Sequence, residues 1–157
     1  MKTIRNLGPA LLALLAAAAC SDSTPSVSVT AATPDQLVPS DDARDDLVIT
    51  VEYEDGDGDL GGGTAEVYDC RADGLRSDLP LPLIAPEAVV GDPIRGTLEL
   101  HVNDVGAIAP GAVPEICRDL GVEAVGASAA VFCVVLIDAA GHAGDGDCTR
   151  EIGLTAE

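Results

Sequence analysis

The clearest pattern in the chain is the alternation of apolar and polar residues in LVITVEYE, residues 47–54. In an extended segment, one face would carry four apolar side chains, those of Leu47, Ile49, Val51 and Tyr53. Successive side chains of a β-strand point to opposite faces, so this period predicts a strand with one face on a core. Residues 96–103, GTLELHVN, repeat the pattern and predict a second such strand.

Other apolar runs predict further elements. Residues 130–137, AVFCVVLI, are apolar at every position, which is typical of a central strand. Residues 64–70 and 149–154 predict shorter strands. Alternate prolines in residues 79–86 predict an extended edge rather than a central strand. Residues 114–120 predict a short helix, which the following glycine would end.

Short strands, Gly and Pro turns and little helix predict one all-β domain. We expect an antiparallel β-sandwich of about seven strands, spanning residues 47–157. Residues 20–46 are rich in Ser, Thr, Pro and Asp and predict a flexible linker in front of it. Val27 and Val29 alternate within this stretch, so a short strand there is an alternative.

Residues 131–142, VFCVVLIDAAGH, resemble the penultimate strand and turn of bacterial immunoglobulin-like domains. Those domains often show an apolar run followed by Asp-Ala-Ala-Gly-Asn, and His142 takes the place of the Asn here. The resemblance implies an immunoglobulin-like order of strands. The chain departs from antibody domains because it has no Trp and no Cys…Trp…Cys spacing. Such a fold does not by itself determine a function.

The chain opens with MKTIRNLGPALLALLAAAAC, which has the layout of an export signal. Lys2 and Arg5 precede an uncharged apolar stretch shorter than the roughly 20 residues of a transmembrane helix. Small residues then lead directly to Cys20. This end resembles the lipobox of bacterial lipoproteins, in which the cysteine is diacylated on sulfur and becomes the new N-terminus.

The resemblance implies a signal peptide over residues 1–19 and attachment to a membrane of the bacterial cell envelope through lipidated Cys20. Ser21 after the cysteine implies the outer membrane, if the host has one. Ala17 stands where the family prefers Leu. The alternative is an ordinary cleaved signal, which would leave the protein periplasmic or secreted.

Cysteine usage agrees with export. If Cys20 carries lipid, four cysteines remain for two disulfides, Cys70, Cys117, Cys133 and Cys148. A sandwich favours Cys70–Cys117, which leaves Cys133–Cys148, although a hairpin would be expected to offset the latter two by several residues. Cys70–Cys133, between neighbouring strands, is an alternative. Without a CxxC pair, a zinc site is disfavoured.

The formal net charge is −19 at pH 7. Such a charge repels nucleic acid and anionic membrane surfaces and favours cations. We therefore expect no nucleic-acid partner.

Two acidic loops are the candidate site. In YEDGDGDLGGG, residues 53–63, three aspartates alternate with glycine in the D-x-D-x-D spacing of an EF-hand loop. Leu60 replaces the glycine that an EF-hand requires, and the flanks are strands. The loop therefore predicts either a Ca²⁺ site of another kind, since Ca²⁺ takes about six to eight oxygens, or a solvated turn.

The second loop, residues 138–147, has the same composition. If residues 47–54 form the second strand of an immunoglobulin-like sandwich, both loops lie at one end. Six candidate Ca²⁺ ligands would then meet there, Asp55, Asp57, Asp59, Asp138, Asp145 and Asp147. If residues 47–54 are the first strand, the loops lie at opposite ends. His142 could ligate a transition metal with Asp145, or be an exposed turn residue.

These features predict an exported, non-enzymatic surface module, stabilised by Ca²⁺ and with a binding or structural role toward a cell-surface or protein partner. One alternative is a small hydrolase that uses paired carboxylates or a metal held by His142. The chain has few aromatic residues for a cleft and no H-E-x-x-H or Ser-His-Asp motif, which argues against it. Another alternative is an inert acidic accessory lipoprotein.

Overall fold

The computed structural model describes residues 24–39, 46–72, 76–84, 91–103, 105–106, 108 and 111–155. Over these residues the chain forms strands in three sheets and a single short helix. The all-β class predicted from the sequence is therefore confirmed. The predicted signal peptide and Cys20 lie outside the described residues. No helix of the described part is long and apolar enough to cross a membrane.

The first sheet consists of β1 (Ser26–Thr33), β3 (Leu47–Asp55) and β6 (Ile94–Val102), with β3 in the middle and all pairs antiparallel. The apolar rows of β3 and β6 lie opposite each other, with Val51 facing Leu98. Alternate residues of β3 are buried, which confirms the strand predicted from the period of two.

The second sheet contains, in spatial order, β5 (Arg76–Pro80), β4 (Thr64–Asp69), β8 (Phe132–Ile137) and β9 (Asp147–Cys148). The strand β8 lies between two neighbours and its first five residues are buried, as predicted for a central strand. Within the described residues β5 pairs only with β4, which confirms an edge where the proline-rich segment begins.

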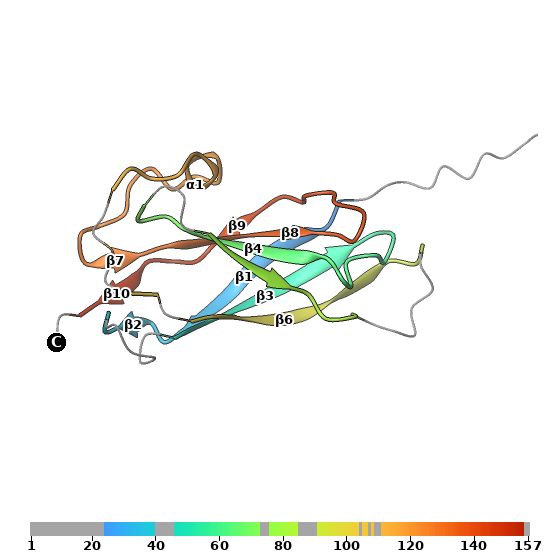
Figure 1. Ribbon diagram of the computed structural model, residues 1–157, viewed down its shortest axis with the longest axis horizontal. Helices are drawn as coiled ribbons and strands as arrows, with labels where there is room; N and C mark the ends of the chain where they lie inside the picture. Colours follow the sequence, from blue (N-terminus) through green and yellow to red (C-terminus); the bar gives the residue numbers. More distant parts are fainter. Residues whose placement is uncertain are drawn as a thin grey trace, which may run out of the picture.

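A small third sheet lies at one end of the molecule (Figure 1). It joins β2 (Gln36–Leu37) and β7 (Ala129–Ala130) on either side of β10 (Ile152–Leu154). The pairing is parallel between β2 and β10 and antiparallel between β7 and β10. This sheet adds the buried side chains of Leu37 and Ile152 to the main core.

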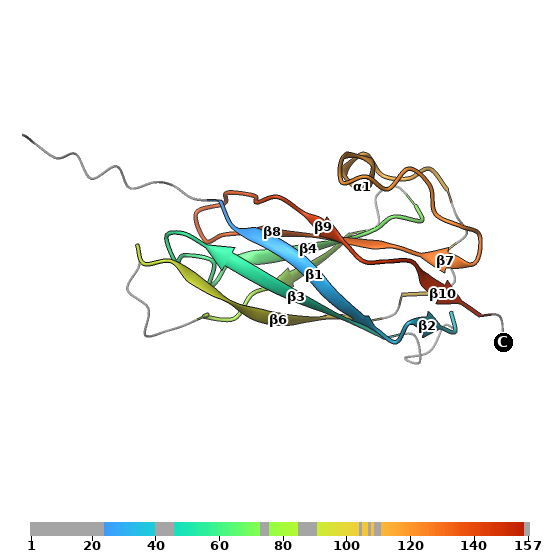
Figure 2. The same ribbon diagram turned by 180° about the vertical axis from the view of Figure 1, so that it is seen from behind.

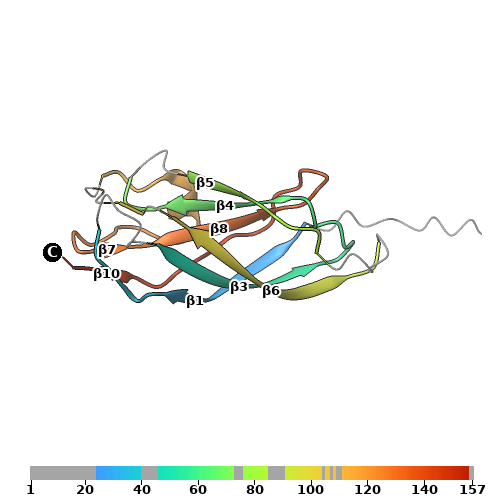
Figure 3. The same ribbon diagram turned by 60° about the horizontal axis from the view of Figure 1, so that its bottom comes forward.

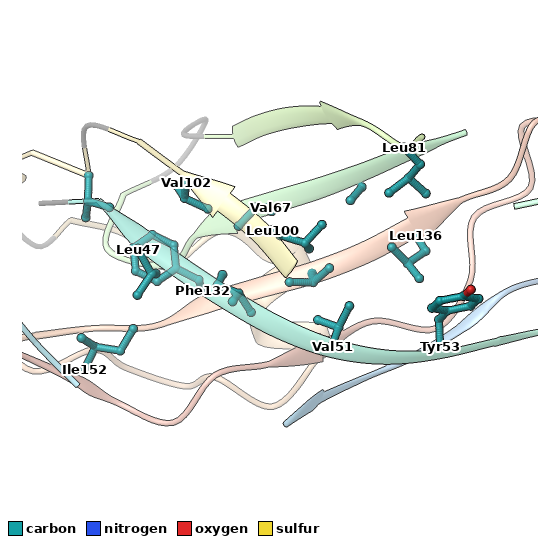
Figure 4. Packing of buried hydrophobic residues seen from close by; sticks show 14 of the residues in the cluster. Leu47, Val51, Tyr53, Val67, Leu81, Leu100, Val102, Phe132, Leu136 and Ile152 are labelled. Atoms are coloured by element: carbon teal, nitrogen blue, oxygen red, sulfur yellow. The ribbon is translucent and has the colours of Figure 1, made fainter. Parts of the chain in front are cut away.

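The two larger sheets pack face to face around the main core (Figure 3). Leu47, Val51, Leu100, Phe132 and Leu136 point toward one another between the sheets (Figure 4). Burial of each such side chain contributes about 1.5–3 kcal/mol. Val, Leu, Ile and Ala supply most of this core, as expected for a chain in which aromatic residues make up 2%.

The linker predicted over residues 20–46 is wrong for its central part. Residues 26–33 form β1, which pairs along the length of β3, and Pro25 in front of it is fully buried. Val27 and Val29 alternate with Ser and pack against the core. A segment that looks polar in sequence therefore forms an edge strand of the first sheet. β1 lies between β3 and the hairpin that ends in β9 (Figure 2). The domain therefore includes this strand.

The helix α1 (Glu115–Asp119) confirms the short helix predicted from the sequence. Gly121 follows it with a φ of 91°, a conformation that favours glycine. The helix lies over the second sheet on the side away from the first (Figure 1). Half-buried side chains around it, including Ile116 and Leu120, pack on Val131 and three buried cysteines. This second cluster gives the fold a local third layer.

Two disulfides close this region, Cys70–Cys117 and Cys133–Cys148. This is the pairing that the sequence favoured, and Cys70–Cys133 is not formed. The expected offset within the hairpin is wrong, because Cys133 lies directly opposite Cys148. A tight turn explains the difference: the amide of Asp138 donates to the carbonyl of His142, which reverses the chain at once.

Candidate metal centre

The loop between β3 and β4 gathers three carboxylates at one point. Asp55 is the last residue of β3, and Asp57 and Asp59 follow it in the loop. One oxygen from each carboxylate lies within 4.8 Å of the others. Gly58, between the last two, has a φ of 74°, and this left-handed conformation lets the backbone curl so that alternate side chains converge.

The three carboxylates share an unusual electrostatic feature. Oδ1 of each of Asp55, Asp57 and Asp59 is buried and lacks a hydrogen-bond partner in the described structure. Asp55 is 1% exposed, and its other oxygen accepts a hydrogen bond from the amide of Leu60 at 2.8 Å. A buried carboxylate oxygen without a partner is costly, and three aimed at one point also repel one another. A cation or bound protons could relieve this repulsion.

The acid–base properties of the loop reflect the same crowding. Burial, followed by the negative charges of Asp138, Asp57 and Asp55, raises the pKa of Asp59 to about 6. Burial also raises the pKa of Asp55, against the hydrogen bond from Leu60. In the absence of a cation, these groups hold protons more tightly than ordinary aspartates do.

Leu60 is the residue of this centre that sequence reasoning missed. Its side chain is fully buried in the main core, while its amide holds Asp55. The loop is thereby pinned between the core and the carboxylates. The available signal was a single large apolar residue within an otherwise polar, glycine-rich stretch.

The second acidic loop lies against the first. The amide of Ala139 donates to the carbonyl of Asp59 at 3.1 Å, so both loops occupy the same end of the molecule. This is the arrangement predicted if residues 47–54 form the second strand, and β1 is the strand that precedes them.

Asp138 is near Asp59 but is not a member of the three-carboxylate group. It is buried, and its Oδ1 accepts a hydrogen bond from the backbone amide of His142 at 2.8 Å. Its Oδ2 lies 3.1 Å from Nδ1 of the same histidine. Asp138 therefore adds negative charge near Asp59 while its own oxygens are engaged. His142 is paired with Asp138. Ligation of a transition metal by His142 and Asp145 stays a prediction.

The remaining two candidates lie elsewhere. Asp145 is exposed, and its backbone pairs with that of Ser26. Asp147 accepts hydrogen bonds from the amides of Val29 at 2.7 Å and Cys148 at 2.9 Å. The hairpin carries both aspartates along the edge of β1. The structure thus brings together three of the six predicted ligands, with a fourth carboxylate nearby.

Comparison with known proteins finds no match among protein-family models, curated proteins or solved structures. The likeness to immunoglobulin-like domains and to lipoprotein signals stays a prediction from the residues that carry it.

Proposed function

We propose that this chain is a non-enzymatic module of the bacterial cell envelope, anchored through Cys20, in which bound Ca²⁺ stiffens one end of the domain. The observation that supports a cation site is the set of three buried oxygens of Asp55, Asp57 and Asp59, which lack hydrogen-bond partners in the described structure. The module has a binding or structural role in which this stiffened end takes part.

Calcium suits the chemistry of the donors. All three are carboxylate oxygens, the ligands of hard cations, and the convergence comes from a curled loop rather than a rigid cage. Ca²⁺ tolerates such irregular geometry and completes its shell with carbonyls and water, whereas Mg²⁺ demands a near-ideal octahedron. With three carboxylates we expect a dissociation constant of about 10⁻⁴ to 10⁻³ M, as in extracellular modules.

The position of the centre supports a structural role. Asp55 ends β3, and the loop leads directly into β4, so an ion here would tie strands from the two larger sheets together. The contact with Ala139 extends that effect to the loop after β8.

The two disulfides support export. Disulfides persist in oxidising compartments such as the periplasm or the outer cell surface, and are rare in the cytosol. Proposed lipidation of Cys20 would use the fifth cysteine.

Thermal unfolding of the full chain, first treated with a chelator, tests the cation. At about ten times the dissociation constant, Ca²⁺ should add about 1.4 kcal/mol to the free energy of unfolding. This corresponds to a rise in Tm of about 3–8 °C. The same concentration of Mg²⁺ should produce a much smaller rise.

Two isosteric variants locate the effect. Asp57→Asn removes one charge of the triad without changing side-chain size and should abolish the response to Ca²⁺. Asp145→Asn removes an exposed charge outside the triad and should retain the full response. If neither the wild type nor Asp145→Asn responds to Ca²⁺, the loop is a turn and the protein is better explained as an inert acidic lipoprotein.

A further inference from the structure

The four cysteines of the domain form one cluster, not two separate cross-links. Sγ of Cys70 lies 3.3 Å from Sγ of Cys133, although each is bonded to a different partner. The sulfurs of Cys70, Cys117 and Cys133 all lie within 4.8 Å of one another. Sulfur atoms of two disulfides are thus in direct contact inside the protein.

The backbone supports this contact. Tyr68 of β4 lies opposite Cys133 of β8, and the amide of Cys70 donates to the carbonyl of Val131 at 2.9 Å. The two cysteines therefore lie diagonally across neighbouring antiparallel strands. A bond between them would not require the strands to separate.

Access from solvent differs among the four residues. Cys70, Cys117 and Cys133 are fully buried, whereas Cys148 on β9 is partly exposed. A small thiol in solution would therefore meet the Cys133–Cys148 bond at Cys148. Disulfide exchange proceeds by attack of a thiolate on a disulfide sulfur, and access decides which sulfur is attacked.

We propose that the two disulfides form an exchange relay that can release α1 from the sheet. In the first step, the thiolate of a small-molecule thiol bonds to Sγ of Cys148, and the bond to Cys133 breaks, leaving a Cys133 thiolate. In the second step, that thiolate bonds to Sγ of Cys70, and Cys117 leaves as a thiolate that takes up a proton. Each step forms one S–S bond and breaks one, so no net oxidation of the protein is required.

Both native disulfides are changed in the product. Cys148, no longer bonded to Cys133, carries the small thiol in a mixed disulfide. Cys70–Cys117 is the covalent tie between α1 and the sheet, and in the product it is replaced by Cys70–Cys133 between β4 and β8. The helix is then held by the half-buried apolar side chains around it, such as Ile116 and Leu120. The relay would convert a change in thiol concentration into mobility of α1, independently of any bound cation.

The relay can be tested without an external thiol in the variant Cys117→Ser. Here Cys70 carries the free thiol, 3.3 Å from a sulfur of the intact Cys133–Cys148 bond. Exchange should move the thiol to Cys148. After acid quench, maleimide labelling and digestion, peptide mass spectrometry should find the label mainly on Cys148 and a cross-link between Cys70 and Cys133. Label on Cys70 with Cys133–Cys148 intact would overturn the proposal.

Two further variants guard against a folding artefact. Cys133→Ser also leaves a thiol at Cys148 but lacks the relay sulfur, so Cys70–Cys117 should stay intact. Cys148→Ser places the thiol at Cys133, and exchange should move it to Cys117. Circular dichroism of each variant should keep the β signature of the wild type. If Cys117→Ser is unfolded, a thiol that stays on Cys133 in folded Cys148→Ser contradicts the relay equally well.

Discussion

At the scale of single residues, the defining feature is a group of three neighbouring carboxylates, each with one oxygen shielded from solvent. Asp55, Asp57 and Asp59 each have a buried oxygen without a partner in the described structure, and the charge of Asp138 acts on Asp59. Such a group can be neutralised by a cation or by protons. The protein should therefore respond to pH and to Ca²⁺ through the same side chains.

The pKa of Asp59 sets the direction of the pH response. Because its pKa in the folded protein is about 6, above the ordinary 3.8, the folded state binds this proton more tightly than the unfolded state. The resulting stabilisation is complete below pH 3.8 and is lost as the pH rises through about 6. In the presence of a chelator, urea unfolding should show falling stability between pH 5 and pH 7.

The matched variant is Asp59→Asn, which cannot titrate. It should flatten the fall over this interval, although Asp55 also has a raised pKa and should leave a residual slope. An unchanged slope in Asp59→Asn would show that Asp59 titrates normally and that the crowding of the triad is relieved in solution.

At the scale of elements, two loops depend on close contact between strands β4 and β8. Gly63 directly precedes β4 and lies against the carbonyl of Ile137 and the backbone of Asp138, with no room for a Cβ. The neighbouring Gly62 faces open space and has a φ of 85°. Gly63 is thus required by the packing between the two loops, and Gly62 by its backbone conformation.

Alanine substitutions should separate these two roles. Gly62→Ala should cost about 1–2 kcal/mol from its left-handed conformation and leave the Ca²⁺ response intact. Gly63→Ala should cost about 1–3 kcal/mol from overpacking and also weaken the Ca²⁺ response, because it pushes the two acidic loops apart. Urea unfolding with and without Ca²⁺ measures both. Equal Ca²⁺ responses in the two variants would show that contact between the loops is unimportant for the centre.

At the scale of the whole molecule, the candidate metal centre lies at the end where the described chain begins. Thr24 and Asp55 line the same cavity of about 620 Å³, and Ser26 pairs with Asp145 of the second loop. A lipidated Cys20 would be joined to this end by a segment of at most about 3.6 Å per residue. The cation would then lie at the end of the domain nearest the membrane, with α1 and the third sheet more distant.

Metabolic labelling tests the anchor on which this orientation depends. In a bacterium that processes lipoproteins, the full chain should incorporate radioactive palmitate and fractionate with membranes. Cys20→Ser should lose the label, whereas Cys148→Ser, which alters a disulfide cysteine, should keep it. Absence of label from the wild type would favour the ordinary secretory signal and a periplasmic or secreted protein.

Much of the fold could be predicted because it depends on local patterns. Alternation in residues 47–54 and 96–103 predicted two strands and their buried faces. The continuous apolar run before Asp138 predicted a strand in the middle of a sheet. The same reasoning underestimated β1, since an edge strand with Ser at alternate positions has the composition of a linker. Only pairing with β3, and cover from the hairpin, make that segment part of the domain.

The sequence by itself determined the all-β class, the apolar faces, the short helix and the supply of cysteines and aspartates, because these follow from neighbours along the chain. The tertiary structure alone decided which of them meet. Three of six aspartates converge, since the amide of Leu60 holds Asp55 in their loop, while Asp147 accepts a hydrogen bond from Val29 within β1. Cys133 faces Cys148, and Cys70 approaches Cys133, because of turn geometry and strand register. Distances between residues far apart in sequence depend on packing, which local periodicity does not encode.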